Sequence, residues 1–205
     1  MKNSFNKKIL EKAYEWIKYN QKIVIITVVE TWGSSPKPIG SKMVVNENKE
    51  FFGSVSGGCV ESFIIQESLD IIKKNKLCRI KKFKVSDESA WNVGLSCGGE
   101  ITVYFQEINF KEKILEQIIQ KKKNKLEFAL LTNLSTGENE IFEEDKPLNK
   151  NFEKFVDQIN FYYRSKKNEI IKDSNIFIEC YNNPIKVIIV GAVDIAQYFT
   201  NFADK

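Results

Sequence analysis

Two short segments, 53–61 and 94–100, set a cysteine among glycines, and they constrain the fold more than any other part of the sequence. The first reads Gly-Ser-Val-Ser-Gly-Gly-Cys-Val-Glu and the second reads Gly-Leu-Ser-Cys-Gly-Gly-Glu, so the two are near mirror images. Glycine pairs let the backbone adopt positive φ and let another atom approach the main chain closely. A cysteine in such a bend can expose its sulfur instead of packing it. The two bends therefore predict a binding site between them.

Composition and charge exclude several classes of protein. Hydrophobic residues make up 42% and aromatic residues 12% of the 205 residues, which is enough for a core and excludes wholesale disorder. The net charge is +4, and the lysine runs are interpreted as solvated surface. Nucleic-acid binding requires basic residues clustered on one face, so this balance does not predict it. A mildly basic chain does suit a small anionic ligand.

No segment predicts export or membrane insertion. The N-terminus has neither the apolar core nor the small-residue cleavage site of a signal peptide. The longest apolar runs, 23–29 and 187–193, are too short to span a bilayer. We therefore expect a cytoplasmic protein that does not bind membranes, and in that compartment its four cysteines should be free thiols.

The residue types that are missing narrow the possible chemistry. The sequence contains no histidine and no Cys-x-x-Cys pair. This excludes a histidine general base, the usual zinc-ligand spacings and any Ser-His or Cys-His nucleophile pair. The chemistry that remains is that of cysteine sulfur, of carboxylates and lysines, and of main-chain N–H groups in the glycine bends.

Hydrophobic periodicity predicts an α/β fold, with a mixed sheet and flanking helices. Prolines and glycines at 31–40 predict a loop that leaves the end of a buried strand, which is where α/β proteins place ligand contacts. In chain order we expect a helix at 6–19, a strand at 22–30, the loop at 31–40, a hairpin from 41–45 and 50–55, a helix at 60–73, a strand at 77–85, a short capped turn or helix at 86–91 and a strand at 100–108.

The second half continues the alternation of helices and strands, and its end has a different character. We expect a helix at 110–123, a hairpin from 126–134 and 140–142, a helix at 147–167 and a strand at 176–181. Residues 184–196 read as an apolar strand, a glycine turn and a helix, which is how a nucleotide-binding βαβ unit begins. A strand of this kind needs neighbours. It therefore either completes another sheet or starts a truncated Rossmann-like domain. The resulting division is a first domain at 1–109, its α/β extension at 110–183 and the Rossmann-like start at 184–205.

Three motifs together resemble the XdhC/CoxI family. They are Gly-Ser-Ser-Pro-Lys-Pro-Ile-Gly-Ser-Lys-Met at 33–43, the first bend at 53–61, and Ser-Asp-Glu-Ser-Ala-Trp-Asn-Val-Gly-Leu-Ser-Cys-Gly-Gly-Glu at 86–100. The motifs occur in the same order as in the family, and the resemblance covers about the first half of the chain. Residues 190–197 resemble the start of the family's C-terminal Rossmann domain.

The resemblance implies an accessory protein for molybdenum hydroxylases such as xanthine dehydrogenase. Family members are implicated in binding the molybdenum cofactor, in promoting its sulfuration and in delivering it to the target apoenzyme. The resemblance therefore implies a cofactor chaperone more than an enzyme. The molybdenum hydroxylase apoenzyme is the expected partner, and a cysteine desulfurase is a further candidate. A homodimer or a complementary C-terminal chain is also expected, because the apolar terminal strand needs covering.

The terminal segment departs from the dinucleotide-binding pattern. Val193 and Ala196 stand where a dinucleotide fingerprint has its second and third glycines. Asp194 stands where the family commonly has histidine. No dinucleotide binding is therefore carried over from the family to these residues.

The chemistry of the cofactor selects the candidate site residues. The molybdenum cofactor is an anionic pterin dithiolene that carries a phosphate and a soft metal. Cys59 is the first candidate for a thiolate ligand to that metal, because soft sulfur suits a soft metal and the resemblance points to the same cysteine; Cys97 is the second. Glycine N–H groups form nests that bind anions. The candidates for this role are Gly57, Gly58, Gly98 and Gly99.

Other polar residues of the motifs have two interpretations each. Ser34, Ser35 and Lys42 are candidates for phosphate or pterin contacts, although a lysine is more often simply solvated. Glu61 and Asp87 either orient pterin N–H groups or cap helices, and capping is the commoner role.

Aromatic and cysteine side chains outside the two bends also have competing interpretations. Trp32 and Trp91 are core or interface aromatics, or they stack on a pterin. Cys78 and Cys180 lie in apolar strands and are expected to be small buried hydrophobes.

Three other functions compete with the chaperone hypothesis. A thiol-dependent sulfurtransferase or redox protein would use Cys59 with Cys97 as the resolving thiol. The two are 38 positions apart, so the fold would have to bring their Cα atoms within about 7 Å. A dinucleotide-binding oxidoreductase is disfavoured by the glycine-poor terminal segment. A basic nucleic-acid module is the least favoured of the three.

Overall fold

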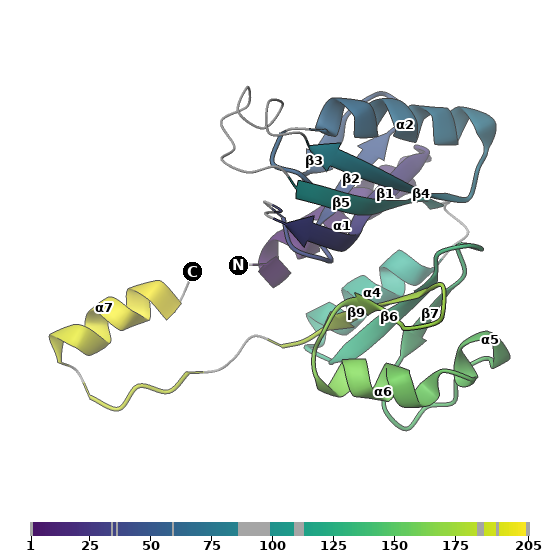
Figure 1. Ribbon diagram of the computed structural model, residues 1–205. Helices are drawn as coiled ribbons and strands as arrows, with labels where there is room; N and C mark the ends of the chain where they lie inside the picture. The colour runs from purple at the N-terminus through teal and green to yellow at the C-terminus, as the bar shows by residue number, and fades with distance from the viewer. Residues whose placement is uncertain are drawn as a thin grey trace.

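The computed structural model describes residues 2–33, 35, 37–58, 60–85, 99–108, 113–183, 187–191 and 193–203. Within them the strands form a five-stranded sheet of order β3-β2-β1-β5-β4 and a four-stranded sheet of order β7-β6-β9-β8 (Figure 1). The strands are β1 Ile23–Gly33, β2 Lys42–Asn46, β3 Phe51–Gly53, β4 Cys78–Val85, β5 Gly99–Ile108, β6 Phe128–Asn133, β7 Asn139–Phe142, β8 Glu169–Ile170 and β9 Ile176–Tyr181.

Helices lie on both sides of the five-stranded sheet. Figure 1 shows α2 on one side, and α1, α4 and the four-stranded sheet on the other. The helices are α1 Lys2–Lys18, α2 Glu61–Lys74, α4 Ile114–Lys123, α5 Lys150–Glu153, α6 Val156–Arg164 and α7 Asp194–Ala203. The α/β class with flanking helices is therefore confirmed.

Strand β1 forms the centre of the five-stranded sheet, and its composition explains why. Its β-branched run is buried on both faces: Val24, Ile26 and Val28 pack with α2, whereas Ile23 and Ile25 pack with α1. β-branched side chains fit such a pleated, doubly covered surface well. A β-bulge between Val28 and Glu30 interrupts the register with β5, and beyond it the strand becomes exposed.

The described strand pairs are antiparallel, where the sequence predicted a mixed sheet. The reason lies in the connections. Pairs β1–β2, β2–β3 and β4–β5 are each consecutive in the chain, and each is joined without a crossover of the sheet, which produces antiparallel neighbours. The crossover helix α2 joins β3 and β4, which run in the same direction but lie at opposite edges. The connection through α2 is therefore a crossover between strands of the same direction, but these strands are not neighbours and form no parallel pair.

The four-stranded sheet has its own core against α5 and α6. Phe152 and Ile159 are fully buried there, beside Leu131 and Ile178. The hairpin expected around 135–139 is confirmed as β6 and β7. The expected helix at 147–167 is instead two helices, α5 and α6. The apolar spacing continues through the break because Phe152 and Ile159 pack into one core, so periodicity alone does not reveal it. The short strand β8 was not predicted.

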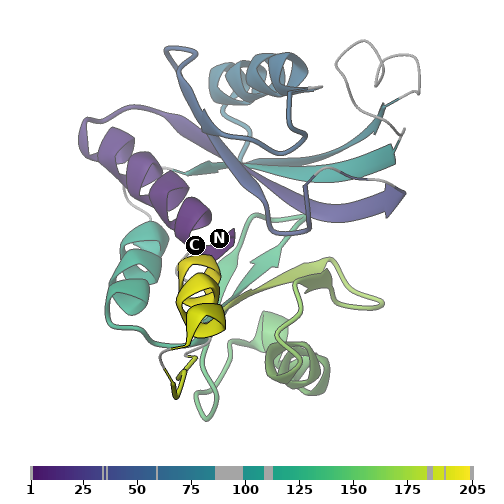
Figure 2. The same cartoon turned by 90° about the vertical axis from the view of Figure 1, so that its left-hand side faces the viewer.

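The terminal segment differs from its prediction in one respect. The helix is confirmed as α7, but residues 187–190 form no strand. Strand geometry requires a neighbour that pairs with its N–H and C=O groups, and no described strand lies beside this segment. Figure 1 shows α7 apart from both sheets, and in Figure 2, turned by 90°, α7 lies in front of them. Ile188 and Val190 are almost fully exposed. Among the described helices, α7 included, none has the length and apolar character needed to cross a membrane.

Candidate functional site

The register of the five-stranded sheet brings the sequence motifs to one end of it. Gly33, the last residue of β1, pairs with Gly99, the first residue of β5. Gly99 pairs in turn with Val85, the last residue of β4. The end of β1, the end of β4 and the start of β5 therefore lie side by side at one end of the sheet.

The first glycine–cysteine bend starts at the same end. β3 runs parallel to β1 in direction and ends at Gly53, which pairs with Met43 of β2. The next residue, Ser54, donates its N–H to the carbonyl oxygen of Lys42 at 3.2 Å. β1, β3 and β4, which lead into the three motifs, thus all run toward the same end of a single sheet.

The carboxylate of Glu61 organises the first bend. Its Oε1 accepts the Ser54 hydroxyl at 2.6 Å and the Ser56 N–H at 3.1 Å. Its Oε2 accepts the Gly58 N–H at 2.9 Å, the Val60 N–H at 3.3 Å and the Ser56 hydroxyl. Glu61 is the first residue of α2, so its charge also lies at the positive end of that helix.

These contacts decide what the bend glycines can do. The Gly57 N–H donates to Ser54 Oγ at 2.9 Å and the Gly58 N–H donates to Glu61. Both N–H groups of the predicted anion nest thus already have partners within the protein, and the Glu61 carboxylate holds the bend together at the start of α2. Burial alone would raise the pKa of Glu61, but hydrogen bonds from Ser54, Ser56 and the backbone outweigh it and lower the pKa to about 2.

Replacing Glu61 by glutamine is expected to lower the free energy of unfolding at pH 7 by roughly 1–2 kcal/mol, once the shift is discounted for the half-exposed position. Because the folded-state pKa is depressed, the stabilisation is present above about pH 4.5 and is lost as the pH falls toward 2. Urea unfolding at several pH values measures the difference between wild type and variant.

The matched control for this prediction is Glu116→Gln. Glu116 is an exposed acidic residue in the first turn of α4 and has no comparable set of donors. Its replacement should change stability only slightly at every pH. A Glu61→Gln deficit that stays constant between pH 7 and pH 3 would contradict the role of the Glu61 carboxylate in holding the bend together.

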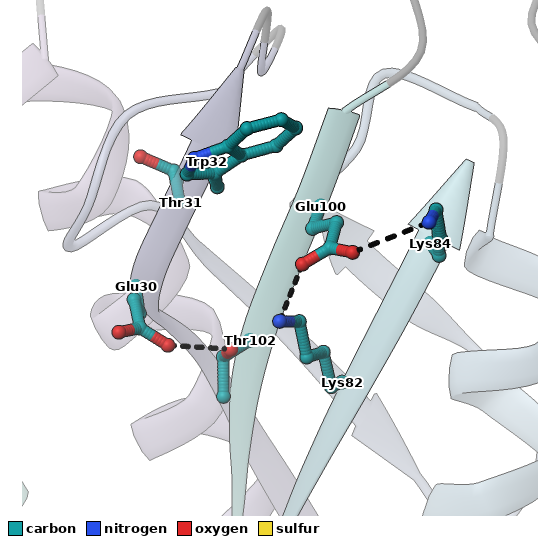
Figure 3. Close-up of a pocket in the computed structure, with 7 residues that line it drawn as sticks. All are labelled: Glu30, Thr31, Trp32, Lys82, Lys84, Glu100 and Thr102. Atoms are coloured by element: carbon teal, nitrogen blue, oxygen red, sulfur yellow. Dashed lines mark hydrogen bonds and ion pairs between the residues drawn. The ribbon is translucent and has the colours of Figure 1, made fainter. Parts of the chain in front are cut away.

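A hollow of about 420 Å³ lies at the same end of the sheet, on the face opposite α2 (Figure 3). Except for Thr31, its lining residues alternate along three adjacent strands. The lining residues are Glu30, Thr31 and Trp32 of β1, Glu100 and Thr102 of β5, and Lys82 and Lys84 of β4. Of these, the sequence analysis considered only Trp32 as a ligand contact. The i, i+2 spacing of the polar residues at the strand ends is the signal that would have found the others.

Cross-strand contacts order the hollow. Glu30 Oε2 accepts the Thr102 hydroxyl at 3.0 Å. Glu100 forms an ion pair with Lys82, and Lys84 Nζ lies 3.7 Å from Glu100 Oε1. The hydrogen bond with Lys82 is the main cause that lowers the pKa of Glu100, and the same bond raises the pKa of Lys82. The hollow therefore combines an exposed indole with two carboxylates and two ammonium groups.

Lys42 is buried between the two sheets, away from this surface. Its Nζ lies 2.9 Å from Glu179 Oε2 and donates to Thr27 Oγ1 at 2.8 Å. This geometry favours a structural role, and a contact with the cofactor stays a prediction. Ser35 donates its hydroxyl to the Lys37 carbonyl at 2.8 Å and so supports the loop after β1. Gly99 is half-buried at the start of β5.

Several predicted site residues lie outside the described residues: Cys59, Cys97, Gly98, Ser34, Asp87 and Trp91. Beside Cys59 in the sequence, Gly58 has φ +123°, and a Cβ placed on it would meet no atom within 4 Å, so the bend is open at that point. Among the described residues no group of three or more histidine, cysteine, aspartate or glutamate side chains is arranged to hold a metal ion.

The two described cysteines fit the interpretation as packed side chains. Burial, together with the charge of Glu179, raises the pKa of Cys180 to about 12, so its thiol stays protonated. Cys78 is half-buried, and its Sγ lies 3.8 Å from the Leu134 carbonyl oxygen.

Comparison with known proteins confirms the family resemblance. Residues 16–81, which contain the first two motifs, match the sequence model of the XdhC and CoxI family. Over 108 residues the chain is 32% identical to the molybdenum cofactor insertion chaperone PaoD of Escherichia coli (strain K12), which covers 52% of this chain and 33% of PaoD. Over 96 residues it is 28% identical to the uncharacterized protein YqeB of the same organism, which covers 47% of this chain and 17% of YqeB.

A solved structure has the same fold. The crystal structure of a protein described as a xanthine dehydrogenase, from Bacillus halodurans, superposes with a TM-score of 0.62 at 20% sequence identity. The match covers 89% of this chain and 53% of that protein. The chain thus spans about a third or less of the two curated relatives and about half of the solved structure.

Proposed function

We propose that this protein, whose residues 16–81 match the XdhC and CoxI family, binds the molybdenum cofactor and inserts it into a molybdenum hydroxylase. One structural observation carries the proposal: β1, β3 and β4 end, and β5 begins, at or next to the motif residues, and the ends of β1, β4 and β5 line an open polar hollow. The resemblance of half of the chain to an insertion chaperone supports the same activity.

The described residues suit an anionic cargo that must be released again. Lys82 and Lys84 are exposed at the hollow, and ion pairs of exposed side chains are weak because water screens them, so a ligand displaces them at little cost. The open rim of the hollow allows the cargo to leave. Such a site recognises and transfers, and it needs no acid–base pair. The thiolate of Cys59, with Cys97 second, is proposed as the protein's contact with the soft metal of the cargo.

The proposed partners follow from the cargo. The acceptor is a molybdenum hydroxylase apoenzyme, such as a xanthine dehydrogenase, and sulfuration of the cofactor on this protein would use a cysteine desulfurase as sulfur donor. The exposed apolar side chains of 187–199 would be covered by a second copy or by a complementary C-terminal chain that completes a Rossmann-like domain. We place these events in the cytoplasm.

Equilibrium binding of isolated molybdenum cofactor, measured as molybdenum per chain after gel filtration, tests the proposed function. Wild type is expected to retain about one molybdenum per chain. Cys59→Ala should lose at least nine-tenths of it while keeping its folded circular dichroism spectrum, because a thiolate supplies the soft ligand. Cys97→Ala should lose less.

The matched control is Cys78→Ala, because this thiol packs against the Leu134 carbonyl away from the motifs. It should load with molybdenum like wild type. Wild-type protein that retains no molybdenum, both alone and with a complementary C-terminal chain added, would contradict the proposed function. Full loading of Cys59→Ala with molybdenum would contradict the assignment of Cys59 as the metal ligand.

A further inference from the structure

Trp32 offers a flat apolar surface at the rim of the hollow. Its side chain is 72% exposed, although tryptophan usually contributes to cores or interfaces. Figure 3 shows the indole projecting from β1 toward β5, above Glu100, which is its partner in the strand register. A planar heterocycle can stack on such a ring, and base–aromatic stacking of this kind typically changes affinity by about 5–150-fold.

Glu30 supplies a hydrogen-bond acceptor two residues before the indole, on the same face of β1. Its Oε2 accepts the Thr102 hydroxyl, and its Oε1 has no hydrogen-bond partner among the described residues. A carboxylate binds best to two parallel N–H groups, as in its pairing with arginine. The 2-amino-4-oxo edge of a pterin, or of guanine, presents two such donors, N–H and NH2, side by side.

Lys84 supplies a cation that can turn toward a phosphate. Its Nζ lies 3.7 Å from Glu100 Oε1, which is an ion pair without a hydrogen bond, and its side chain is 78% exposed. Lys82 would continue to neutralise Glu100 if Lys84 moved away. The hollow thus places a stacking surface, an acceptor pair and a mobile cation around one open volume.

We propose that this hollow binds the pterin end of the cargo: the ring stacks on Trp32, its 2-amino-4-oxo edge donates to Glu30, and its phosphate is bound by Lys84. The inference rests on the proposed function and deepens it, because it assigns the organic part of the cofactor to described residues that do not include the two motif cysteines. A guanine nucleotide shares this chemistry and is the alternative source of such a ligand.

The test measures binding of four small molecules by isothermal titration calorimetry: 6-hydroxymethylpterin, its monophosphate, guanosine monophosphate and lumazine, in which an oxo group replaces the 2-amino group. Wild type should bind the pterin phosphate best and lumazine at least tenfold more weakly than pterin. Trp32→Leu should weaken all pterin binding at least fivefold. Glu30→Gln should abolish the preference for pterin over lumazine. Lys84→Gln should weaken binding of the pterin monophosphate and leave binding of the unphosphorylated pterin unchanged.

The control variant is Phe63→Leu, which removes an equally exposed aromatic side chain from α2, on the opposite face of the sheet. It should bind all four compounds like wild type. Equal binding of pterin and lumazine by wild type, or pterin binding unaffected by Trp32→Leu, would overturn the inference. Tighter binding of guanosine monophosphate than of the pterin phosphate would overturn the assignment to the cofactor.

Molybdenum loading of the same variants separates this inference from the proposed function. Stoichiometric loading of wild type without any pterin binding in the hollow would end the inference and leave the chaperone function standing. If pterin binding depends on Trp32 and Glu30 but the wild-type protein never loads molybdenum, the pterin site would stand and the chaperone function would be contradicted. Both results are expected to be positive, with Trp32→Leu reducing pterin affinity and molybdenum loading together.

Discussion

Replacing Lys42 by methionine is expected to lower the free energy of unfolding by about 3–5 kcal/mol, because it leaves the carboxylate of Glu179 buried without its cation. The two charged atoms are 2.9 Å apart, and the side chains are only 5% and 4% exposed. The pair joins β2 of one sheet to β9 of the other. The Tyr181 hydroxyl, which donates to Glu179 at 3.0 Å, would be the main remaining partner of that carboxylate.

Two further variants test whether the unpaired charge is the cause. In Lys42→Met with Glu179→Gln the buried charge is gone and an acceptor for the Tyr181 hydroxyl is kept, so most of the loss should be recovered. Lys12→Met breaks an exposed ion pair with Glu15 and should cost less than about 1 kcal/mol. Urea unfolding at pH 7 compares the four proteins. A deficit below about 1 kcal/mol at pH 7 would contradict the role of the buried pair, and so would a double variant that is no more stable than Lys42→Met.

Lys42 shows what sequence reasoning cannot reach. The sequence analysis considered it as a phosphate or pterin contact or as a solvated lysine, and its neighbours in the sequence give no sign of Glu179, which lies in another sheet. The Lys42 carbonyl also accepts the Ser54 N–H at the start of the first bend. The buried pair therefore links the second sheet to the strand from which the first bend is held.

Patterns within one element were predicted well, because they depend on nearest neighbours. The β-branched run of β1 and the apolar spacing of α1 and α2 were visible in the sequence. Such features need no knowledge of what packs against them.

Features that depend on the order of strands were not predictable in this way. The hollow exists because β5 returns between β1 and β4, which places Trp32, Glu100 and Lys84 in one row. No local pattern fixes that order, and the antiparallel pairing followed from it. The prediction of a strand in the terminal segment was wrong for a related reason. Residues 187–190 have strand composition, but strand geometry depends on a neighbouring strand.

Replacing Gly53 by alanine is expected to destabilise the protein by about 2–4 kcal/mol, which combines backbone strain with overpacking. Gly53 has φ +97°, which side chains other than hydrogen rarely tolerate. A Cβ there would lie 2.6 Å from the Lys42 carbonyl oxygen and 2.8 Å from Ile9 Cδ1. The oxygen belongs to β2 and cannot move without disturbing the strand pair.

Gly58→Ala is the matched control, because it separates the strain from the clash. Gly58 has φ +123°, yet a Cβ there would meet nothing within 4 Å, so only strain of about 1–2 kcal/mol is expected. Urea unfolding of both variants gives the difference, and equal losses would show that the close approach at Gly53 does not matter. The larger loss of stability in Gly53→Ala is expected to come with weaker molybdenum loading. The substitution would break the hydrogen bond from the Ser54 N–H to the Lys42 carbonyl oxygen, and the first bend would then start from a displaced strand end.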